Sequence, residues 1–510
     1  MLKKIRKIAV FIFAVMTAAS PGLRMTAHAE EHYDVYNYDR WEEAIPSQAG
    51  YLAARSVSGQ DLGIGDFSEP SDIFRDAYDQ FFIVDTKNNR IVVTNSELTE
   101  VVMIMDEFKY QDGKTTTLKG PEGIYVAPET DLVYIADYNN SRVLICDYDC
   151  NVQMEITKPE SELFSQELTF LPQRVIADKA GNVYIVLGNI TTGAAMFSNE
   201  GEFQGYYGAN TVEETPAQRL NYLWKSISTD EMRSRTSRTV PAGITSFDLD
   251  DEGFIYTCTQ STSQKKDTVK KLNPAGTNLF ASLETSWGDV ESVYDSNTNK
   301  NYQSMICDIE IADDGNINCL DLTSGRVFQY DEDGNLLFIF GSSSEQLGGF
   351  TEVTAIESLG SEILVLDTRK NTVTIFEETD FGRIVHEATV LYNGGYYEEA
   401  LAPWYQVLQY DGNYRRAFLG ISAALLVEGD YEGSMKYAKL ADSPYRYNRA
   451  FEGYRSEWLT AHINGVMVVV ILLVIGIIAL KQYQKKHYKP NLEYDITRTD
   501  ERKRQEEEGK

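Results

Sequence analysis

The side chains best suited to hold a metal ion and activate water are carboxylates in three short acidic runs. The runs are Asp248, Asp250 and Asp251; Asp313 and Asp314; and Asp331 and Asp333. Carboxylate oxygens are ligands that Ca²⁺ prefers, so runs brought together by the fold would form a calcium site. Each run ends at or just before a glycine, however, as tight turns do. We therefore interpret these acids as turn residues and expect no metal site and no cofactor.

The distribution of histidine argues against two common kinds of active site. The five histidines are His28, His32, His386, His462 and His487, and none falls between residues 70 and 384. Zinc sites and serine nucleophiles with a general base usually require an imidazole, so both are disfavoured there. The sequence also lacks a phosphate-binding glycine loop and a Cys-x-x-Cys pair. We predict from these observations that the protein is not an enzyme.

A basic segment within residues 199–239 is unusual in a chain whose formal charge is −30. It contains Thr215-Pro216-Ala217-Gln218, which is typical of a helix start, and an apolar stripe at helical spacing follows. The candidate partner-binding residues are Arg219, Trp224, Lys225, Arg233, Arg235 and Arg238. Either this helix packs on neighbouring strands with its charges in solvent, or it forms a docking surface for an anionic partner.

A strand that ends in aspartate recurs along the chain and is followed five residues later by arginine or threonine. The clearest pairs are Asp85 with Arg90, Asp137 with Arg142, Asp321 with Arg326, and Asp367 with Thr372. Each pair joins two apolar runs rich in β-branched residues, which is the composition of buried strands. Because the aspartate recurs once in each repeat, we expect it to form hydrogen bonds within its own repeat.

Further strands complete each repeat. Weaker copies occur at residues 182–186 and 254–258, and earlier strands occur at residues 123–126, 174–177, 244–247 and 308–311. Gly181, Gly253 and Gly315 mark tight hairpins between these strands. Strands joined by turns at an interval of roughly 50 residues are the pattern of a propeller blade. A pair of β-sandwiches is the alternative fold.

The second copy resembles a known family. Pro121-Glu122-Gly123-Ile124, followed by Tyr134-Ile135-Ala136-Asp137-Tyr138-Asn139-Asn140-Ser141-Arg142-Val143, is similar to the NHL-repeat consensus. Residues 341–350, rich in glycine and serine, look like that family's connector between blades. The resemblance implies a six-bladed β-propeller over residues 70–384.

Two features of the predicted propeller depart from that pattern or lie outside it. Two blades carry Leu187 and Thr259 in place of the strand-ending aspartate, which leaves their register open. Residues 30–69 precede the repeats, and the segment 33–51 within them is the candidate for an outer strand that closes the ring.

Helical periodicity replaces the strand pattern after the last copy. The segment that begins at Tyr397 recurs 34 residues later at Tyr431, and Gly395 is matched by Gly429. That interval resembles the tetratricopeptide repeat and implies about two repeats within residues 385–458. Such repeats usually bind protein segments, and a structural spacer is the alternative.

Hydrophobic segments at both ends of the chain favour export and membrane anchoring. Residues 1–29 combine a basic start, an apolar run and Ala27-His28-Ala29, the pattern of a cleaved signal peptide. Residues 459–481 include a long uncharged run and are followed by a lysine cluster. This predicts a single transmembrane helix with residues 482–510 as a cytoplasmic tail, because basic flanks face the cytoplasm.

Charge, cysteine count and sorting motifs indicate which kinds of partner and which cellular compartment are favoured. The chain has 77 acidic against 47 basic side chains, which disfavours nucleic acid as a partner. Its five cysteines are an odd number, so at least one thiol lacks a disulfide partner within the chain. The lysine cluster and the absence of an LPxTG motif favour the plasma membrane of a Gram-positive bacterium, with the N-terminal domain outside.

The predicted fold class is mainly β, a six-bladed β-propeller with a C-terminal α-helical, tetratricopeptide-like segment and a single transmembrane helix. The predicted function is that of a membrane-anchored extracytoplasmic binding or scaffolding protein that contacts a protein or a surface glycan. One alternative is a hydrolase or lactonase similar to gluconolactonase-type propellers, whose metal-binding acids have no residue-by-residue match here. Another is an accessory subunit of a membrane transporter.

Overall fold

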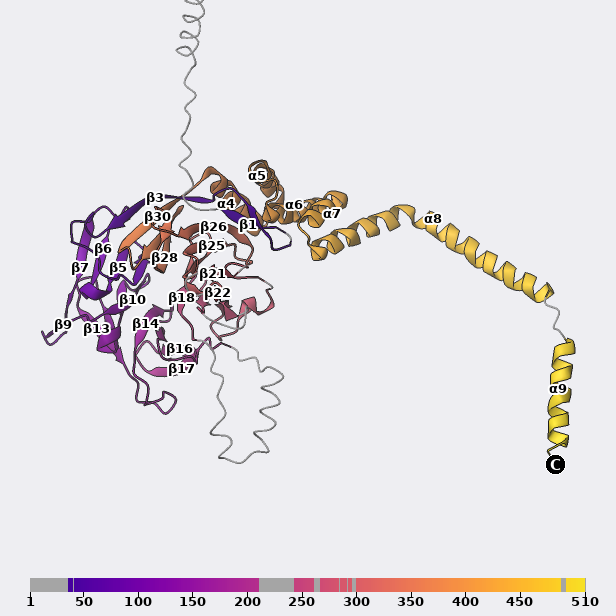
Figure 1. Cartoon of the computed structure of the whole chain (residues 1–510), viewed down its shortest axis with the longest axis horizontal. Coiled ribbons are helices and arrows are strands. Elements are labelled where there is room, and N and C mark those ends of the chain that lie inside the picture. The colour runs from indigo at the N-terminus through magenta and orange to yellow at the C-terminus, as the bar shows by residue number, and fades with distance from the viewer. Residues whose placement is uncertain are drawn as a thin grey trace, which may run out of the picture. The chain divides into compact units, whose positions relative to one another are not determined.

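The computed structural model divides into two compact units, Met1–Ile421 and Ser422–Lys510. The residues that it describes are 35–39, 41–210, 243–260, 267–283, 285–290, 292–295, 300–487 and 492–509. Six antiparallel sheets make up most of the first unit (Figure 1). Their innermost strands contact one another in cyclic order, so the sheets are the blades of a six-bladed propeller, as predicted.

The first three blades each contain four strands. Blade 1 contains β4 (Asp72–Arg75), β5 (Phe81–Asp85), β6 (Arg90–Thr94) and β7 (Val101–Met105). Blade 2 contains β10 (Pro121–Ala127), β11 (Leu132–Asp137), β12 (Arg142–Cys146) and β13 (Val152–Thr157). Blade 3 contains β14 (Pro172–Ala177), β15 (Val183–Leu187), β16 (Ala194–Phe197) and β17 (Phe203–Tyr207).

The other three blades differ in strand number. Blade 4 contains β18 (Ser246–Leu249), β19 (Ile255–Cys258) and β20 (Val269–Leu272). Blade 5 contains β23 (Ile306–Ile311), β24 (Ile317–Asp321), β25 (Arg326–Tyr330), β26 (Leu336–Ser343) and β27 (Gly349–Phe350). Blade 6 contains β28 (Val353–Leu359), β29 (Glu362–Asp367), β30 (Thr372–Glu378) and β3 (Tyr51–Ser58).

Short hairpins and turns lie before, within and between the blades. The hairpins are β1 (Tyr36–Tyr38) with β2 (Ala44–Pro46), β8 (Glu107–Lys109) with β9 (Thr115–Thr117), and β21 (Val293–Asp295) with β22 (Lys300–Tyr302). The 3-10 turns are η1 (Thr86–Asn88), η2 (Tyr138–Asn140) and η4 (Leu279–Ser282). Gly181, Gly253 and Gly315 have φ angles of 82°, 88° and 83°, so the predicted glycine hairpins are confirmed.

The ring is closed by β3, which pairs antiparallel with β30 from Tyr51↔Glu378 to Ser58↔Thr372. The sequence analysis predicted that the segment 33–51 supplies the outer strand that closes the ring, but β3 begins only at the end of that segment. Residues 33–51 instead supply the β1–β2 hairpin, in which the Asn37 amide donates to the Leu337 carbonyl of blade 5 at 3.1 Å. Closure therefore joins residues from both ends of the propeller in one sheet, which ties the first strand to the last blade.

Helices α4 (Asp380–Asn393), α5 (Tyr397–Tyr410) and the first half of α6 (Arg415–Glu428) belong to the same unit as the propeller. They are held on blade 5 by polar contacts. The Tyr414 hydroxyl donates to the Leu337 carbonyl at 2.8 Å, and the Arg416 guanidinium pairs with buried Asp331 at 2.7 Å. These helices are thus fixed to the propeller through side chains of α6 and its start.

The second unit consists of the end of α6, α7 (Tyr431–Leu440), α8 (Pro444–His487) and α9 (Leu492–Glu507). Ser422 and Ser434 donate to each other's carbonyl oxygens at 2.9 and 2.7 Å, which fixes α6 against α7. Among the described helices, α8 alone is long and apolar enough to cross a membrane. Length and composition are the evidence for that capacity.

A candidate ligand-binding channel

The innermost strands of the six blades line a central channel that opens into a cavity of about 820 Å³. These strands are β4, β10, β14, β18, β23 and β28. Side chains of alternate residues on a strand face the same way, so each inner strand presents every second side chain to the channel. The channel is therefore lined by rings of side chains, one from each blade.

Two of these rings define the site. The first ring contains the residues that pair with the position just before the strand-ending aspartate, or before Leu187 or Thr259 where these replace it. They are Asp72, Gly123, Arg174, Ser246, Asp308 and Ala355. The second ring lies two residues further along each strand and contains Phe74, Tyr125, Ile176, Asp248, Glu310 and Glu357. Both rings contribute to the cavity lining.

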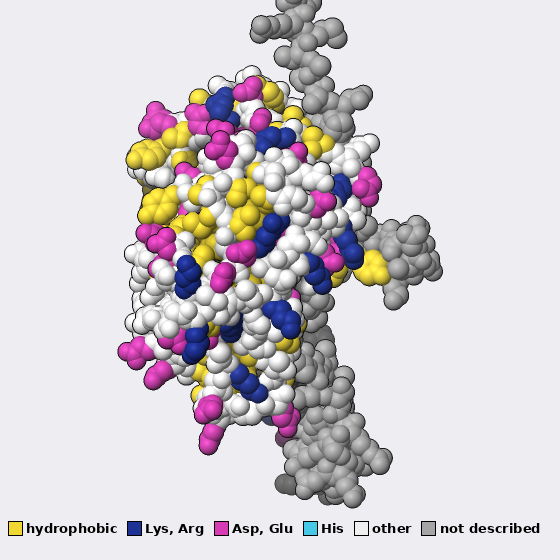
Figure 2. All heavy atoms as spheres, turned by 90° about the vertical axis from the view of Figure 1, so that its left-hand side faces the viewer, with side chains coloured by type: hydrophobic (Ala, Val, Ile, Leu, Met, Phe, Trp, Pro, Cys, Tyr) yellow, Lys and Arg dark blue, Asp and Glu magenta, His cyan; other side chains and the backbone are white. Residues whose placement is uncertain are grey.

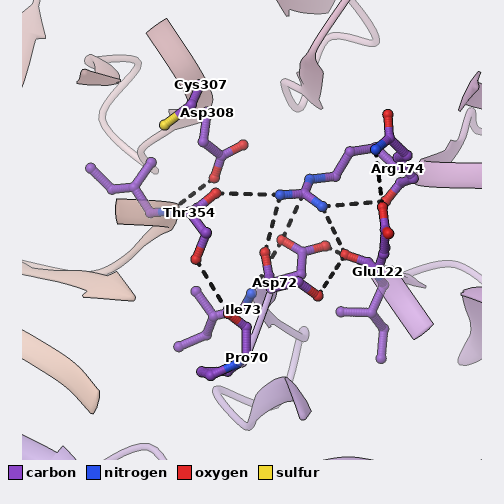
Figure 3. A network of polar contacts seen from close by, with 12 residues as sticks. Pro70, Asp72, Ile73, Glu122, Arg174, Cys307, Asp308 and Thr354 are labelled. Carbon is purple, nitrogen blue, oxygen red and sulfur yellow. Dashed lines mark hydrogen bonds and ion pairs between the residues drawn. The ribbon is translucent and has the colours of Figure 1, made fainter. Parts of the chain in front are cut away.

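Arg174 bridges several blades in the first ring (Figure 3). Its guanidinium donates to the carbonyl oxygens of Glu122, Ser71 and Thr354 at 2.7, 3.1 and 3.3 Å. Its Nε lies 3.8 Å from the Asp72 carboxylate. One cation thus satisfies backbone acceptors of blades 1, 2 and 6, and compensates a buried negative charge.

Channel carboxylates connect neighbouring blades. Each of four carboxyl groups accepts a hydrogen bond from a backbone amide on the innermost strand of the next blade in the ring. The pairs are Asp72 with Ile124 at 2.9 Å, Asp248 with Ile311 at 2.7 Å, Asp308 with Ile356 at 2.9 Å, and Glu357 with Arg75 at 2.9 Å. These acids therefore stabilise the ring itself, because each hydrogen bond joins the innermost strands of two neighbouring blades.

The second ring is divided into an apolar half and an acidic half. Blades 1, 2 and 3 contribute Phe74, Tyr125 and Ile176. The centroids of the Phe74 and Tyr125 aromatic rings are 5.1 Å apart. Blades 4, 5 and 6 contribute Asp248, Glu310 and Glu357, which we call the acidic wall. A ligand in the cavity would thus meet apolar surface on one side and carboxyl groups on the other.

The acidic wall consists of carboxyl groups that hold protons near neutral pH. Burial raises the pKa of Asp248 to about 7. Burial, together with the charge of Asp248, raises the pKa of Glu310 to about 8. Burial and the charges of Glu310 and Asp248 raise the pKa of Glu357 well above its usual range. At neutral pH this wall therefore presents carboxyl groups that both donate and accept hydrogen bonds.

The predicted acidic runs divide into turn residues and channel residues. Asp250, Asp314 and Asp331 accept hydrogen bonds from backbone amides of their own hairpins, as expected of turns. Asp248 differs because it lies on the inner strand β18 and not in a turn, although Asp250, Asp251, Asp313 and Asp314 also line the cavity. Asp313 pairs across the cavity with Arg75 of blade 1. No group of three or more metal-ligating side chains with suitable geometry is found in the described residues.

The strand-ending aspartates lie at the ends of the second strands and bind backbone and neighbouring side chains. Arg90 pairs with Asp85, and Arg142 with Asp137, each at 2.8 Å. Arg326 instead pairs with Asp289 at 3.0 Å, while Ser304 and Ser324 donate to Asp321. Asp367 accepts from the Thr351 amide at 2.7 Å. These contacts are local and structural.

The candidate docking residues of the basic segment, Arg219, Trp224, Lys225, Arg233, Arg235 and Arg238, lie outside the described residues. The start of residues 199–239 is described, and it contains β17, the outer strand of blade 3. The sequence predicts that all of residues 199–239 form a long insertion between the third and fourth blades. That prediction is wrong for Phe203–Tyr207, which form the outer strand of blade 3. The strand was missed because Phe203–Tyr207 includes Gly205, which weakens a strand signal.

Sequence reasoning also missed Arg174, Glu310 and Glu357. The available signal was a charged residue at an alternate position within an otherwise apolar strand, as in Ile309-Glu310-Ile311. Such a residue on a buried strand requires a polar environment, and a propeller offers one in its channel.

The six sheets and their cyclic contacts define the class of protein, a six-bladed β-propeller. Residues 118–146 match the NHL repeat family, so the resemblance seen in the second copy is confirmed over one repeat. No curated protein matches the sequence. Similar solved structures include a virginiamycin B lyase from Staphylococcus aureus (10% identity, 64% of this chain and 99% of that chain, TM-score 0.37). Another is the Kuenenia stuttgartiensis hydrazine synthase (11% identity, 65% and 99%, TM-score 0.37).

Proposed function

We propose that the chain is a membrane-anchored extracytoplasmic binding protein whose propeller channel takes a small polar ligand, such as a glycan unit. The observation that carries this proposal is the cavity of about 820 Å³ with its apolar half and its acidic wall. Hydroxyl groups would exchange hydrogen bonds with the carboxyl groups, and the apolar face of a sugar ring would pack on Phe74 and Tyr125. Among the residues that the structure describes, those that line the cavity include no histidine and no cysteine.

The remaining parts of the chain fit the display of such a domain outside the cell. Residues 1–29 would direct export, and the apolar stretch of α8 would anchor the chain, with residues 482–510 inside. Helices α5 and α7 begin 34 residues apart, at Tyr397 and Tyr431, as consecutive tetratricopeptide-like repeats would. These helices would then offer a scaffold beside the membrane for a protein partner.

Titration calorimetry of the full-length protein in detergent, with a panel of neutral oligosaccharides, tests the channel proposal. Asp248→Asn and Phe74→Ala should each weaken binding at least tenfold, because each removes one side of the site. Glu162→Gln, a change at an exposed loop residue, is the matched control and should bind as the wild type does. Equal binding by all three variants, or no binding to any member of the panel, would contradict the proposal.

An enzyme is the second candidate, and one observation favours it. A carboxyl group whose pKa is raised to about 7, as in Asp248, is suited to general acid–base catalysis near neutral pH. Turnover of lactones or glycosides that is lost in Asp248→Asn would support this candidate over a binding role. Binding of an oligosaccharide without product formation would support the binding role.

A further inference from the structure

The outer strands of the propeller can be compared position by position, because in five blades the outer strand pairs with its neighbour through a one-residue bulge. In blades 1, 2, 3 and 5 the outer strand skips one residue after its first pair, and in blade 6 it skips one after its third pair. The skipped residue and the residue two positions on lie on the same face of the strand. These position pairs are Val102 and Ile104, Gln153 and Glu155, Gln204 and Tyr206, Leu337 and Ile339, and Ala54 and Ser56, in blades 1, 2, 3, 5 and 6.

Blades 2, 3 and 6 carry polar or small residues at these positions, as strands that face water do. Tyr206 is the largest of them, and its ring stacks on that of Phe164, which lies in the segment between β13 and β14. These strands therefore expose little apolar surface, and in blade 2 the Tyr110 hydroxyl donates to Glu155.

Blade 5 carries leucine and isoleucine at these positions and is covered. Leu337 and Ile339 are 0% and 1% exposed. The β1–β2 hairpin and the Tyr414 hydroxyl both bond to the Leu337 carbonyl, and Tyr36 and Tyr38 pack on the cluster that contains Ile339. In blade 5, therefore, the outer strand with apolar residues at the two positions is the one on which other segments of the chain are docked.

Blade 1 has the apolar pattern without a cover. Its outer strand β7 reads Val-Val-Met-Ile-Met, and Val102 and Ile104 are 48% and 39% exposed. Hydrophobic side chains gather on the side of the propeller on which β7 lies (Figures 1 and 2). In the described residues no strand pairs with the outer edge of β7, so its outward amide and carbonyl groups are available to another chain.

We propose that β7 is the docking edge for an extended segment of a partner protein, which adds to blade 1 as a fifth strand. An exposed, apolar edge strand is a template for strand addition, in which backbone hydrogen bonds supply affinity and alternate side chains supply specificity. The segment would carry apolar residues at alternate positions to cover Val102 and Ile104. This surface is separate from the channel and does not depend on a ligand there.

The charged side chains at the two ends of β7 indicate which charge the ends of the partner segment should carry. The turn before β7 contains exposed Glu97 and Glu100, and the residues after it are exposed Asp106 and Glu107. Two basic side chains lie nearby: Lys109, two residues further on, and Arg55 of β3, whose guanidinium donates to the Glu97 carbonyl at 2.6 Å. Acidic side chains therefore outnumber basic ones around this edge. A segment flanked by lysine or arginine at both ends is therefore complementary to this edge.

The same charges disfavour a second copy of this chain as the occupant. Two β7 strands paired antiparallel about Met103 would place Glu100 of one copy opposite Asp106 of the other, twice. Like charges directly opposite one another destabilise a strand pair. The observations therefore favour a basic heterologous segment.

The test uses the full-length protein in detergent and a labelled synthetic peptide with alternating valine and threonine and two lysines at each end. Fluorescence anisotropy should show binding that weakens with added salt, since the flanking charges are exposed. The double variant Val102→Lys and Ile104→Lys should lose at least tenfold in affinity, because lysine blocks an edge strand. Ala54→Lys with Ser56→Lys, at the equivalent positions of blade 6, is the matched control and should bind normally.

Milder changes keep the test decisive if the lysine variant is unstable. Val102→Thr with Ile104→Thr retains strand preference, should melt within a few degrees of the wild type, and should still lose affinity. Equal binding by the threonine variant and the wild type would overturn the proposal. So would equal binding of a peptide with glutamate ends, or a dimer in sedimentation that dissociates when β7 is changed.

Discussion

Replacing Arg174 by methionine tests the polar network that spans the channel. The guanidinium donates to backbone carbonyl oxygens of three blades and lies 3.8 Å from the Asp72 carboxylate. Methionine retains much of the side-chain volume but has neither charge nor a hydrogen-bond donor. The variant therefore leaves three buried acceptors without this donor and Asp72 without its cationic neighbour.

The expected loss is about 3–5 kcal/mol of unfolding free energy, the usual cost of removing one partner from a buried ion pair. Part of this loss depends on pH. Burial raises the pKa of folded Asp72 to about 7, although Arg174 opposes the rise, whereas an unfolded aspartate titrates near pH 4. Because the folded pKa is the higher one, the contribution of Asp72 is favourable below about pH 4 and declines as pH rises through about 7. Without Arg174 the pKa rises further, so the decline becomes larger.

Urea unfolding at pH 5 and pH 8 measures both parts of the prediction. The loss caused by Arg174→Met should be greater at pH 8 than at pH 5, by about 1 kcal/mol or more. Adding Asp72→Asn to Arg174→Met should recover part of the loss at pH 8, because the neutral amide needs no cation. An equal loss at the two pH values would refute the coupling of Asp72 to Arg174.

Two further predictions concern the acidic wall and the helices. Since burial raises the pKa of Glu310 to about 8, the folded protein keeps a proton that the unfolded chain releases near pH 4.5. Stability should therefore fall from about pH 5 to pH 8, and Glu310→Gln should flatten that fall in melting curves; an unchanged slope would contradict this. Arg416→Met should cost about 3–5 kcal/mol, because it breaks the buried pair with Asp331. Arg383→Met, at an exposed ion pair with Glu387, is the control and should cost less than about 1 kcal/mol in urea unfolding; equal losses would contradict the prediction.

The blades could be predicted because their determinants are local. Asp137 and Arg142 lie five residues apart, and the strand pairs and glycine turns follow along the chain in the order in which they pack. The channel could not be predicted in the same way. Glu310 and Glu357 belong to different blades and become neighbours only when six inner strands converge, so their joint effect on pKa depends on the closed ring.

The sequence also could not predict which outer strands are covered by other segments of the chain. The Leu337 strand and the Val102 strand have similar apolar patterns, yet blade 5 is covered by segments from both sides of the propeller in sequence. Closure by β3 has the same character, because Tyr51–Ser58 is identified as an outer strand through its pairing with β30. Long-range pairing of this kind leaves little trace in local composition.

The most direct test of the account is the exposure of the propeller on intact cells stripped of their wall. Protease added to such protoplasts should remove residues 30 to about 460 and leave a small protected fragment that contains the apolar stretch of α8 and the tail. This result is expected on the proposed topology, which rests on the signal-peptide pattern of residues 1–29, the apolar run and the lysine cluster. A propeller that resists protease until the membrane is broken would contradict a role in binding ligands outside the cell.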